Sequence, residues 1–184
     1  MAEHVCPVWV GYFLACPLRK LFQNPKKILG PYVERGMKVL DIGCAMGFFS
    51  LPMAEMVGCE GKVFCFDVQE EMLASLQKRA QKAGASYNID AHVCSTDSLG
   101  LDGLSDQIDF ALASAVVHEV PSAKSFFSEI YGAIKPDGRF LVVEPKGHVS
   151  QKDFEDSISK AEKAGFSVIN RPQISRSRSV LLGK

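Results

Sequence analysis

KVLDIGCAMGFFSLPMAEMVGCEGKVFCFD, residues 38–67, is the stretch of this 184-residue chain that decides the fold. An apolar run reaches an acid at Asp41, a turn contains Gly43 and Gly47, an amphipathic stretch follows, and a second apolar run closes at Asp67. This order predicts a strand, a turn, a helix and a second strand. In a parallel sheet, the right-handed crossover brings the turn and the end of the second strand to one edge. We therefore expect a ligand cleft at that edge.

The glycine turn and the closing acid have separate roles in the expected cleft. Gly43 and Gly47 permit a positive φ and a close approach of the backbone to a ligand, and a helix beginning near Met46 would point free N–H groups at it. Asp67 can accept hydrogen bonds from both hydroxyls of a ribose. Together these residues predict a nucleoside site.

The spacing of the glycines favours one class of nucleoside. A dinucleotide fingerprint reads G-x-G-x-x-G, so that a pyrophosphate can lie on the helix terminus, whereas this turn reads D-I-G-C-A-M-G. Asp41, two residues before the first glycine, would repel a pyrophosphate but can face a cationic ammonium group, directly or through water. S-adenosylmethionine carries such an ammonium group.

Four segments of the chain form an ordered set, and they are VLDIGCAMGFFS (39–50), GKVFCFDVQEEML (61–73), IDFALASAVVHEV (108–120) and IKPDGRFLVVEP (134–145). Together they resemble the class I S-adenosylmethionine-dependent methyltransferases of the small-molecule type. In chain order, the segments match the family's first motif, second motif, fourth strand and fifth strand. Glycine-rich turns recur by chance, so the order and spacing of the four segments carry the resemblance, which covers most of residues 36–145.

The resemblance implies an α/β fold, namely a Rossmann-like, doubly wound, three-layer α/β/α domain. Its seven-stranded sheet would be mostly parallel, with an antiparallel C-terminal strand. We expect a single domain, residues 1–184, in which 1–35 is a helical lid or cap and 36–184 is the core. The residue patterns predict strands at 38–42, 62–67, 89–95, 108–114, 139–144, 166–170 and 179–182, and helices at 24–34, 48–57, 69–84, 123–134 and 152–164.

The resemblance also implies which residues bind the cofactor, S-adenosyl-L-methionine. One group would surround the methionine part, a second would contact the ribose and the base, and a third would form the adenine edge and the floor near the methyl group. The first group is Asp41, Gly43, Cys44, Ala45 and Gly47. The second group is Asp67, Val68 and Met72, and the third is Ser95, Thr96 and Ser114.

Two positions depart from the family pattern. Ala45 stands where the commonest form, D-x-G-x-G-x-G, has its central glycine, which adds a methyl group close to the methionine moiety or its turn. The family's third strand usually leads into an acid that contacts adenine, but here Ser95 and Thr96 align with that position and Asp97 comes one or two positions late. Backbone groups can recognise adenine instead, and Asp97 can cap a turn.

His118 is the candidate catalytic residue. Methyl transfer from a sulfonium is an in-line displacement, in which positioning of the reactants can supply roughly 7–11 kcal/mol of the barrier. A weakly acidic nucleophile additionally needs a base. His118 follows the fourth predicted strand, beside Glu119, and imidazole accepts a proton near neutral pH. The alternative is that His118 is a structural element of its loop.

The N-terminal segment HVCPVWVGYFLACPLRKLF, residues 4–22, carries more large apolar residues than a linker. We expect it to be buried. As a lid over the cleft it would exclude water, with Trp9, Tyr12 and Phe13 as aromatic walls for a substrate or for the sulfonium. Packing against the sheet edge or a partner subunit is the alternative, and the protein is expected to be a monomer or a homodimer.

His4, Cys6 and Cys16 form a second constellation in the same segment. If the segment covers the cleft, the two thiols could hold trivalent arsenic, which some members of the resembling family methylate. The alternative is simple burial of small side chains. We expect no resident metal, because the intervals between the six cysteines match no zinc template.

The composition argues against several functional classes. The 21 basic and 21 acidic residues give a net charge of zero, which is unlike a nucleic-acid-binding surface. The longest apolar stretch is shorter than the roughly 20 residues of a membrane-spanning helix, and the N-terminus lacks the basic residues of a signal peptide. We expect a cytoplasmic protein with reduced cysteines. Arg171, Arg176 and Arg178 fit a solvated hairpin surface or a contact with an anionic substrate.

The sequence therefore predicts an S-adenosylmethionine-dependent methyltransferase that acts on a small molecule. The acceptor atom stays open among oxygen, nitrogen, sulfur, carbon and arsenic. Two other classes stay open as well. One is a non-catalytic cofactor binder that regulates a partner, and the other is a nicotinamide-dependent oxidoreductase, which the glycine spacing disfavours.

Overall fold

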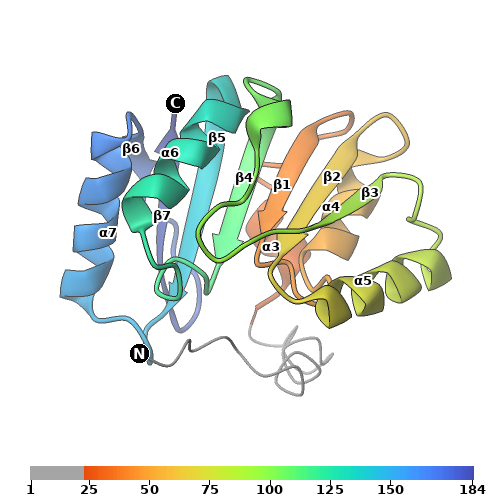
Figure 1. The fold of residues 1–184 in the computed structure, drawn as a ribbon, viewed down its shortest axis with the longest axis horizontal. Coiled ribbons are helices and arrows are strands. Elements are labelled where there is room, and N and C mark those ends of the chain that lie inside the picture. The colour runs from red at the N-terminus through yellow and green to blue at the C-terminus, as the bar shows by residue number, and fades with distance from the viewer. Residues whose placement is uncertain (1–22) are drawn as a thin grey trace.

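The computed structural model describes residues 23–184, which form one seven-stranded sheet (Figure 1). The strand order is β3-β2-β1-β4-β5-β7-β6. Neighbouring strands are parallel except for β7, which is antiparallel to both β5 and β6. The predicted mostly parallel sheet with an antiparallel C-terminal strand is confirmed. The strands are β1 Lys38–Ile42, β2 Lys62–Asp67, β3 Ile89–Val93, β4 Ile108–Ser114, β5 Ile134–Pro145, β6 Ser167–Asn170 and β7 Ser177–Gly183.

Helices cover both faces of the sheet, which confirms the three-layer architecture. In the view of Figure 1, α6 and α7 lie in front of the sheet and α3 and α4 lie behind it. No helix within residues 23–184 is long and apolar enough to cross a bilayer. The helices are α3 Pro25–Leu29, α4 Ser50–Val57, α5 Glu70–Lys82, α6 Ala123–Ala133 and α7 Gln151–Lys163, with a short 3-10 helix, η1, at Asp102–Leu104.

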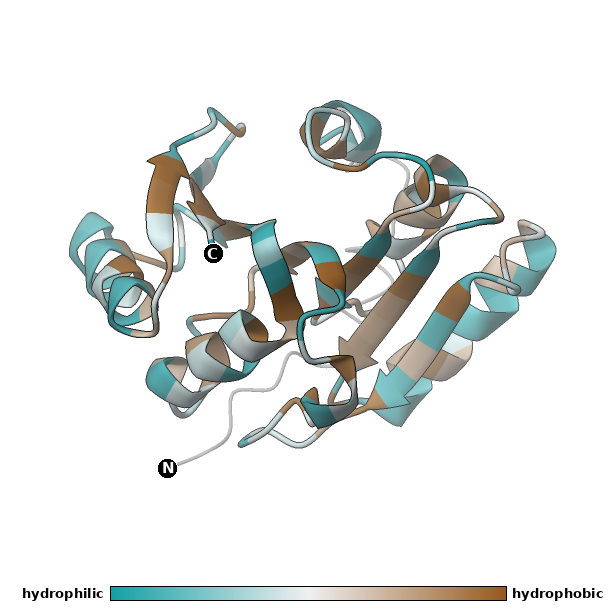
Figure 2. Ribbon diagram, turned by 90° about the horizontal axis from the view of Figure 1, so that it is seen from above, coloured by the Kyte–Doolittle hydropathy of each residue, from teal (hydrophilic) through white to brown (hydrophobic). Residues whose placement is uncertain are grey.

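The core has two layers because the side chains of a strand alternate between the faces of the sheet. On the central strand β4, Phe110 and Leu112 pack with α3, α4 and α5, whereas Ala111 and Ala113 pack with α6 and α7. All four are fully buried. The apolar strands at the centre of Figure 2 show this interior. The loop that follows β4 therefore starts from a strand that is fixed on both faces.

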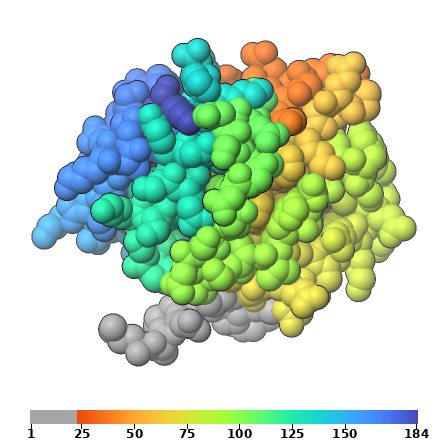
Figure 3. Space-filling model, turned by 45° about the horizontal axis from the view of Figure 1, so that its top comes forward, coloured from red at the N-terminus to blue at the C-terminus, as the bar shows by residue number. Residues whose placement is uncertain are grey.

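The strand order also separates the early and late parts of the chain. Figure 3 shows residues of the first half gathered at one end of the molecule and the C-terminal residues at the other. The two halves meet between β1 and β4, where the order of the strands reverses. Ligands of open α/β sheets bind at such a reversal, beyond the carboxyl ends of the strands.

Strand β5 begins earlier than its sequence pattern predicts. The strand expected from Arg139 starts at Ile134, directly after α6, although Pro136 lies inside it. Two steps along β4, from Ile108 to Phe110, match five steps along β5, so β5 contains an irregular, bulged segment. Because Pro136 lies in that segment, its missing N–H removes no bond from the ladder.

Other element boundaries also differ from their predicted positions by a few residues. The helix predicted at 24–34 ends at Leu29, and the helix predicted from Phe48 begins at Ser50. A positive φ at Gly47 delays the start of regular helix. Strand β3 ends at Val93, two residues before its predicted end.

Two glycines of the turn after β1 are required by close packing. Gly43 has φ +65°, and a Cβ there would lie 2.3 Å from Cγ2 of Val116. Gly47 has φ +82°, and a Cβ there would lie 2.3 Å from Cδ1 of Leu76 on α5. The turn is therefore held between α5 and the loop after β4, and a side chain at either position would push these elements apart.

We expect Gly47→Ala to destabilise the protein more than Gly84→Ala. Both glycines have positive φ, so each substitution incurs the left-handed strain of about 1–2 kcal/mol. Nothing lies within 4 Å of a Cβ at Gly84, whereas a Cβ at Gly47 would overlap Leu76. Overpacking adds about 1–3 kcal/mol. Urea denaturation measures the difference, and equal losses of unfolding free energy would show that the contact with Leu76 is not a constraint.

Candidate active site

A cavity of about 460 Å³ lies at the carboxyl ends of β1, β2, β4 and β5. Its volume is typical of small-molecule sites. Gly47, predicted to bind the cofactor, does not line it and instead packs against Leu76. The structure brings the other predicted residues together in its wall, and these are Asp41, Gly43, Cys44, Ala45, Asp67, Val68, Met72, Ser95, Thr96, Ser114 and His118.

Asp67, the last residue of β2, is fixed by two backbone hydrogen bonds. Its Oδ2 accepts from the N–H of Ala45 at 2.9 Å, and its Oδ1 accepts from the N–H of Gln69 at 2.9 Å. The carboxylate is mostly buried, and this burial raises its pKa, while the N–H groups oppose the shift. Each carboxylate oxygen can accept a further hydrogen bond. Asp67 therefore presents a pre-oriented acceptor to the cavity.

The sequence predicted free N–H groups in the glycine turn, but three of them form hydrogen bonds to β2. Gly43 and Cys44 both donate to the carbonyl oxygen of Phe66, at 2.8 and 3.1 Å, and Ala45 donates to Asp67. The helix begins at Ser50 rather than near Met46. These hydrogen bonds join the turn after β1 to the end of β2, so the ends of the two strands border the cavity as one unit.

Asp41 lines the cavity from the end of β1, but one of its oxygens is already engaged. Ser50 at the start of α4 donates its hydroxyl to Oδ2 of Asp41 at 2.5 Å. Both residues are buried. Sequence reasoning missed Ser50, although a hydroxyl at the end of the motif, on a helix face that must be buried, was the available signal.

Ala45 adopts a backbone conformation that favours glycine. Its φ is +45°, and it lies in the cavity wall. Ala115, which follows β4, also lines the cavity and has φ +60°. A left-handed alanine costs about 1–2 kcal/mol. Both turns that border the cavity therefore contain local strain, a feature that clusters at functional sites.

The thiols beside the cavity are protonated. The pKa of Cys44 is raised by its hydrogen bond to Cys65 and by burial. The side chain of Cys44 packs in the core. Cys94 lines the cavity, and burial together with the charge of Asp67 raises its pKa to about 11. Neither thiol is a nucleophile near neutral pH.

The predicted adenine edge is a tight turn after β3. Ser95 Oγ accepts from the N–H of Ser98 at 3.0 Å and donates to its carbonyl oxygen at 3.1 Å. Thr96 and Asp97 follow in the cavity wall. Ser95 therefore shapes the turn, while Thr96 and Asp97 remain available at the surface of the cavity.

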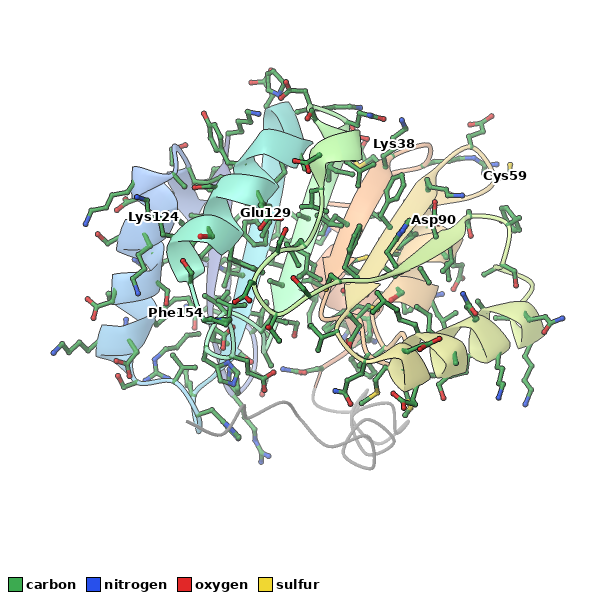
Figure 4. All side chains as sticks on the ribbon, viewed as in Figure 1. Lys38, Cys59, Asp90, Lys124, Glu129 and Phe154 are labelled. Carbon is green, nitrogen blue, oxygen red and sulfur yellow. The ribbon has the colours of Figure 1, made fainter. Side chains whose placement is uncertain are left out.

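Glu129 on α6 holds the same loop from the other side, and sequence reasoning missed it. Its Oε2 accepts from the N–H groups of Leu99 and Gly100 at 2.9 and 3.0 Å and from the hydroxyl of Ser98 at 3.0 Å. Figure 4 labels Glu129 on this helix, over the middle of the sheet. One carboxylate thus ties the loop after β3 to the opposite half of the fold.

His118 forms a short hydrogen bond with Glu144 at the end of β5. The distance from Nδ1 of His118 to Oε2 of Glu144 is 2.5 Å. Glu144 is buried, and its Oε1 accepts from the N–H groups of Val116 and Val117 at 3.1 and 2.9 Å. A carboxylate can only accept a hydrogen bond, so in the neutral imidazole Nδ1 carries the proton and Nε2 keeps its lone pair.

The pKa values of His118 and Glu119 are both raised, for different reasons. The pKa of His118 is raised above 6.5, chiefly by the hydrogen bond to Glu144, and burial opposes the shift. Glu119, 3.8 Å from Nε2, has its pKa raised chiefly by burial. Sequence reasoning named His118 but not Glu144, because the two residues are 26 positions apart.

Other predicted features lie away from the cavity or outside the described residues. Trp9, Tyr12, Phe13, His4, Cys6 and Cys16 belong to the N-terminal segment that the structure does not describe. The described cysteines, Cys44, Cys59, Cys65 and Cys94, are free thiols. Cys59 is exposed at the end of the sheet opposite the cavity (Figure 4).

The three C-terminal arginines separate in the structure. Arg171 forms a two-pronged ion pair with Glu155 on α7 at 2.8 and 2.9 Å. Arg176 lines the cavity. Arg178 donates from Nε to Gln151 at 3.1 Å. The cluster is therefore more than an exposed hairpin surface.

Comparison with known proteins gives a family match over most of the chain. A family model described as a methyltransferase domain matches residues 33–173. Curated relatives include the ubiquinone/menaquinone biosynthesis C-methyltransferase UbiE of Escherichia fergusonii, 27% identical over 76% of this chain and 53% of the relative. Protein-L-isoaspartate O-methyltransferase 1 of Arabidopsis thaliana is 26% identical over 79% and 61%. The chain spans 28–61% of the lengths of the first four curated relatives.

Solved structures match the fold at low identity, and they support the same conclusion about architecture. A SAM-dependent methyltransferase from Aquifex aeolicus superposes with a TM-score of 0.86 at 24% identity, over 97% of this chain and 99% of its own. A TehB-like SAM-dependent methyltransferase from Corynebacterium glutamicum gives 0.74 at 17% identity, over 97% and 100%. The match to the family model shows that the chain belongs to the methyltransferase-domain family and is an S-adenosylmethionine-dependent methyltransferase domain.

Proposed function

We propose that the protein transfers the methyl group of S-adenosylmethionine to a small molecule that binds beside His118. The observation that carries this proposal is the cavity itself. Its wall contains the fixed carboxylate of Asp67 at the end of β2 and the hydrogen-bonded His118 after β4. The first suits a ribose, and the second suits the removal of a proton from an acceptor.

The cavity fits the cofactor in its chemistry. Asp67 offers two oriented acceptors for ribose hydroxyls. Asp41 places a carboxylate near the turn, where it would attract the ammonium group of the methionine part. Val68, Met72, Thr96 and the turn after β3 would enclose the base, and Ser114 would lie under the methyl group. When bound, the sulfonium supplies an activated methyl group and a neutral leaving group.

The protein's own contribution to the reaction is positioning and proton transfer. Glu144 holds the backbone of Val116 and Val117 and the ring of His118 together, so the loop that faces the acceptor is rigid. Nε2 of His118 can accept the proton that an oxygen, nitrogen or sulfur acceptor loses as its new bond to carbon forms. Imidazole in this tautomer, with its cation stabilised by a buried carboxylate, is suited to a general base.

The acceptor is proposed to be a small molecule because relatives such as UbiE are named for small-molecule pathways. Arsenite methylation rests on His4, Cys6 and Cys16, which lie outside the described residues. The described part of the chain gives no observation in favour of a regulator without activity.

Three further features belong to the proposal. Within the predicted lid, residues 1–35, α3 packs into the core behind the sheet, so we propose that only the part before α3 closes the cavity, which is supported by Gln23, the first described residue, in the cavity wall. We propose a cytoplasmic location, which suits the free thiols. The protein is proposed to act as a monomer or a homodimer.

We expect Asp67→Asn to weaken the binding of S-adenosylhomocysteine. The substitution removes the charged acceptor and keeps the size of the side chain. Hydrogen bonds to a charged group contribute about 1.5–3 kcal/mol, so the dissociation constant should rise roughly tenfold to hundredfold. Titration calorimetry on the purified protein measures the change.

The matched control is Asp102→Asn, on the short helix η1 outside the cavity. It removes the same charge from the protein and should leave the affinity unchanged. An Asp67→Asn variant that binds S-adenosylhomocysteine as tightly as the original protein would refute the assignment of Asp67 to the ribose.

We expect Glu144→Gln to lower the pKa of His118 and to change its tautomer. The hydrogen bond to Glu144 is the largest cause of the raised pKa, and a glutamine amide cannot supply the charge. NMR titration of the imidazole nitrogens reads both the pKa and the tautomer without any acceptor. In the original protein Nδ1 should carry the proton above the pKa.

Glu119→Gln is the control for general charge effects. Glu119 contributes the smallest of the causes that raise the pKa of His118, so its removal should lower that pKa less than Glu144→Gln does. A pKa that is equally low in both variants would show that Glu144 does not control the pKa of His118.

The raised pKa of His118 also makes the stability of the folded protein depend on pH. Its contribution to the free energy of unfolding is complete below pH 6.5 and is lost as the pH rises through the pKa of the folded state.

A further inference from the structure

A second, smaller recess lies beside the active-site cavity at the same edge of the sheet. It has a volume of about 180 Å³. Lys146 after β5, Gln151 on α7, and Arg171 and Arg178 on either side of the turn before β7 contribute to its wall. Ser177 lines both the recess and the active-site cavity. The recess is therefore adjacent to the part of the cavity bordered by β5 and β7.

The charge of the recess is positive. Lys146, Arg171 and Arg178 contribute three cations. Glu155 is the acid that pairs with Arg171, and this ion pair lowers the pKa of Glu155 so that it stays ionised. Glu144 stands opposite Arg178 in the pairing of β5 with β7, but its oxygens bond to His118 and to the loop after β4. The recess thus keeps an excess of positive charge after these acids are counted.

One donor of the recess lacks a partner. Nη1 of Arg178 is buried and has no hydrogen-bond acceptor within residues 23–184, although Nε of the same guanidinium donates to Gln151 at 3.1 Å. A buried N–H without an acceptor is unfavourable. An oxygen acceptor bound next to this guanidinium would offset that cost.

The wall of the recess is pre-organised. Gln151 accepts from Arg178 and donates from Nε2 to Glu155 at 2.6 Å, while Glu155 accepts both prongs of Arg171. This chain fixes the orientation of both guanidinium groups before any ligand binds. Guanidinium groups in fixed orientation favour carboxylate and phosphate oxygens.

We propose that the recess binds an oxyanionic group, a carboxylate or a phosphate, that is carried by the methyl acceptor. The position of Ser177 in both walls means that an acceptor whose reacting atom lies near His118 can extend its anionic end past β7. Arg176, in the wall of the active-site cavity, lies next to Ser177 in the chain. This inference rests on the proposed function and assigns its substrate class.

The first test uses inorganic phosphate and needs no acceptor. Phosphate is titrated into the full chain at constant ionic strength, with chloride as the reference, while the side-chain Nε–H signal of Arg178 is followed by NMR. We expect a saturable shift. The substitution Lys146→Gln changes an exposed side chain, and it should raise the dissociation constant of phosphate by at least about fivefold.

Two further variants make this test specific. Arg178→Gln should weaken phosphate-induced thermal stabilisation. Arg139→Gln should not, because this exposed arginine lies at the far end of the pairing between β5 and β7. S-adenosylhomocysteine affinity should be the same in all of these proteins, which keeps a failure of the recess distinct from a failure of the cofactor site. No saturable shift, or equal weakening by Arg139→Gln, would overturn the anion site.

The second test separates an anion on the acceptor from a free anion. Acceptors are screened by release of S-adenosylhomocysteine, and each active one is compared with a neutral analogue. We expect anionic acceptors to be preferred, phosphate to compete with them, and Arg178→Gln to raise KM for the anionic acceptor with little change in kcat. Phosphate that binds without competing would show a free anion in the recess and overturn the assignment to the acceptor.

Discussion

The hydrogen bond from the N–H of Ala45 to the carboxylate of Asp67 is the contact on which the rest of the site depends. It joins the turn after β1 to the end of β2, and the bonds from Gly43 and Cys44 to Phe66 reinforce it. A buried carboxylate is costly unless donors surround it. The two N–H groups that stabilise Asp67 also aim it, so the acid that suits a ribose is oriented before a ligand arrives.

The opposite side of the cavity repeats this arrangement with different residues. There the buried carboxylate of Glu144 accepts from two N–H groups of the loop after β4 and orients His118. Each half of the sheet thus supplies one buried acid that fixes a turn and presents a functional group. The strand order reverses between these halves, which places the two groups in the wall of one cavity.

The parts of the fold that the sequence predicted well are those encoded locally. The apolar runs of β1 and β2, the acids that end them and the glycines between them are neighbours in the chain, so their pattern predicts the strand-turn-helix-strand unit. The spacing could not predict that Gly47 packs against Leu76 rather than a ligand, since both uses need a glycine. The early start of β5 depends on a bulge against β4, which is a property of the pairing and not of either segment.

Apart from the contact of Ser50 with Asp41, nine positions away, the contacts that were missed join residues far apart in the chain. Glu129 bonds to Leu99 and Gly100, and Glu144 bonds to His118. No local periodicity marks such a glutamate, because its role appears only when another loop is brought next to it. The sequence showed a group of three arginines near the C-terminus. It could not show that Arg171 pairs with Glu155, that Arg178 bonds to Gln151 and that Arg176 lines the cavity, because these contacts depend on the fold.

Titration calorimetry of the full chain with S-adenosylmethionine, S-adenosylhomocysteine and NADH tests the central claim most directly. The arrangement of Asp41, Asp67 and the glycine turn predicts micromolar binding of both adenosyl compounds and no binding of NADH, because a pyrophosphate would meet the carboxylate of Asp41. Absence of binding by the adenosyl pair, or a preference for NADH, would contradict it.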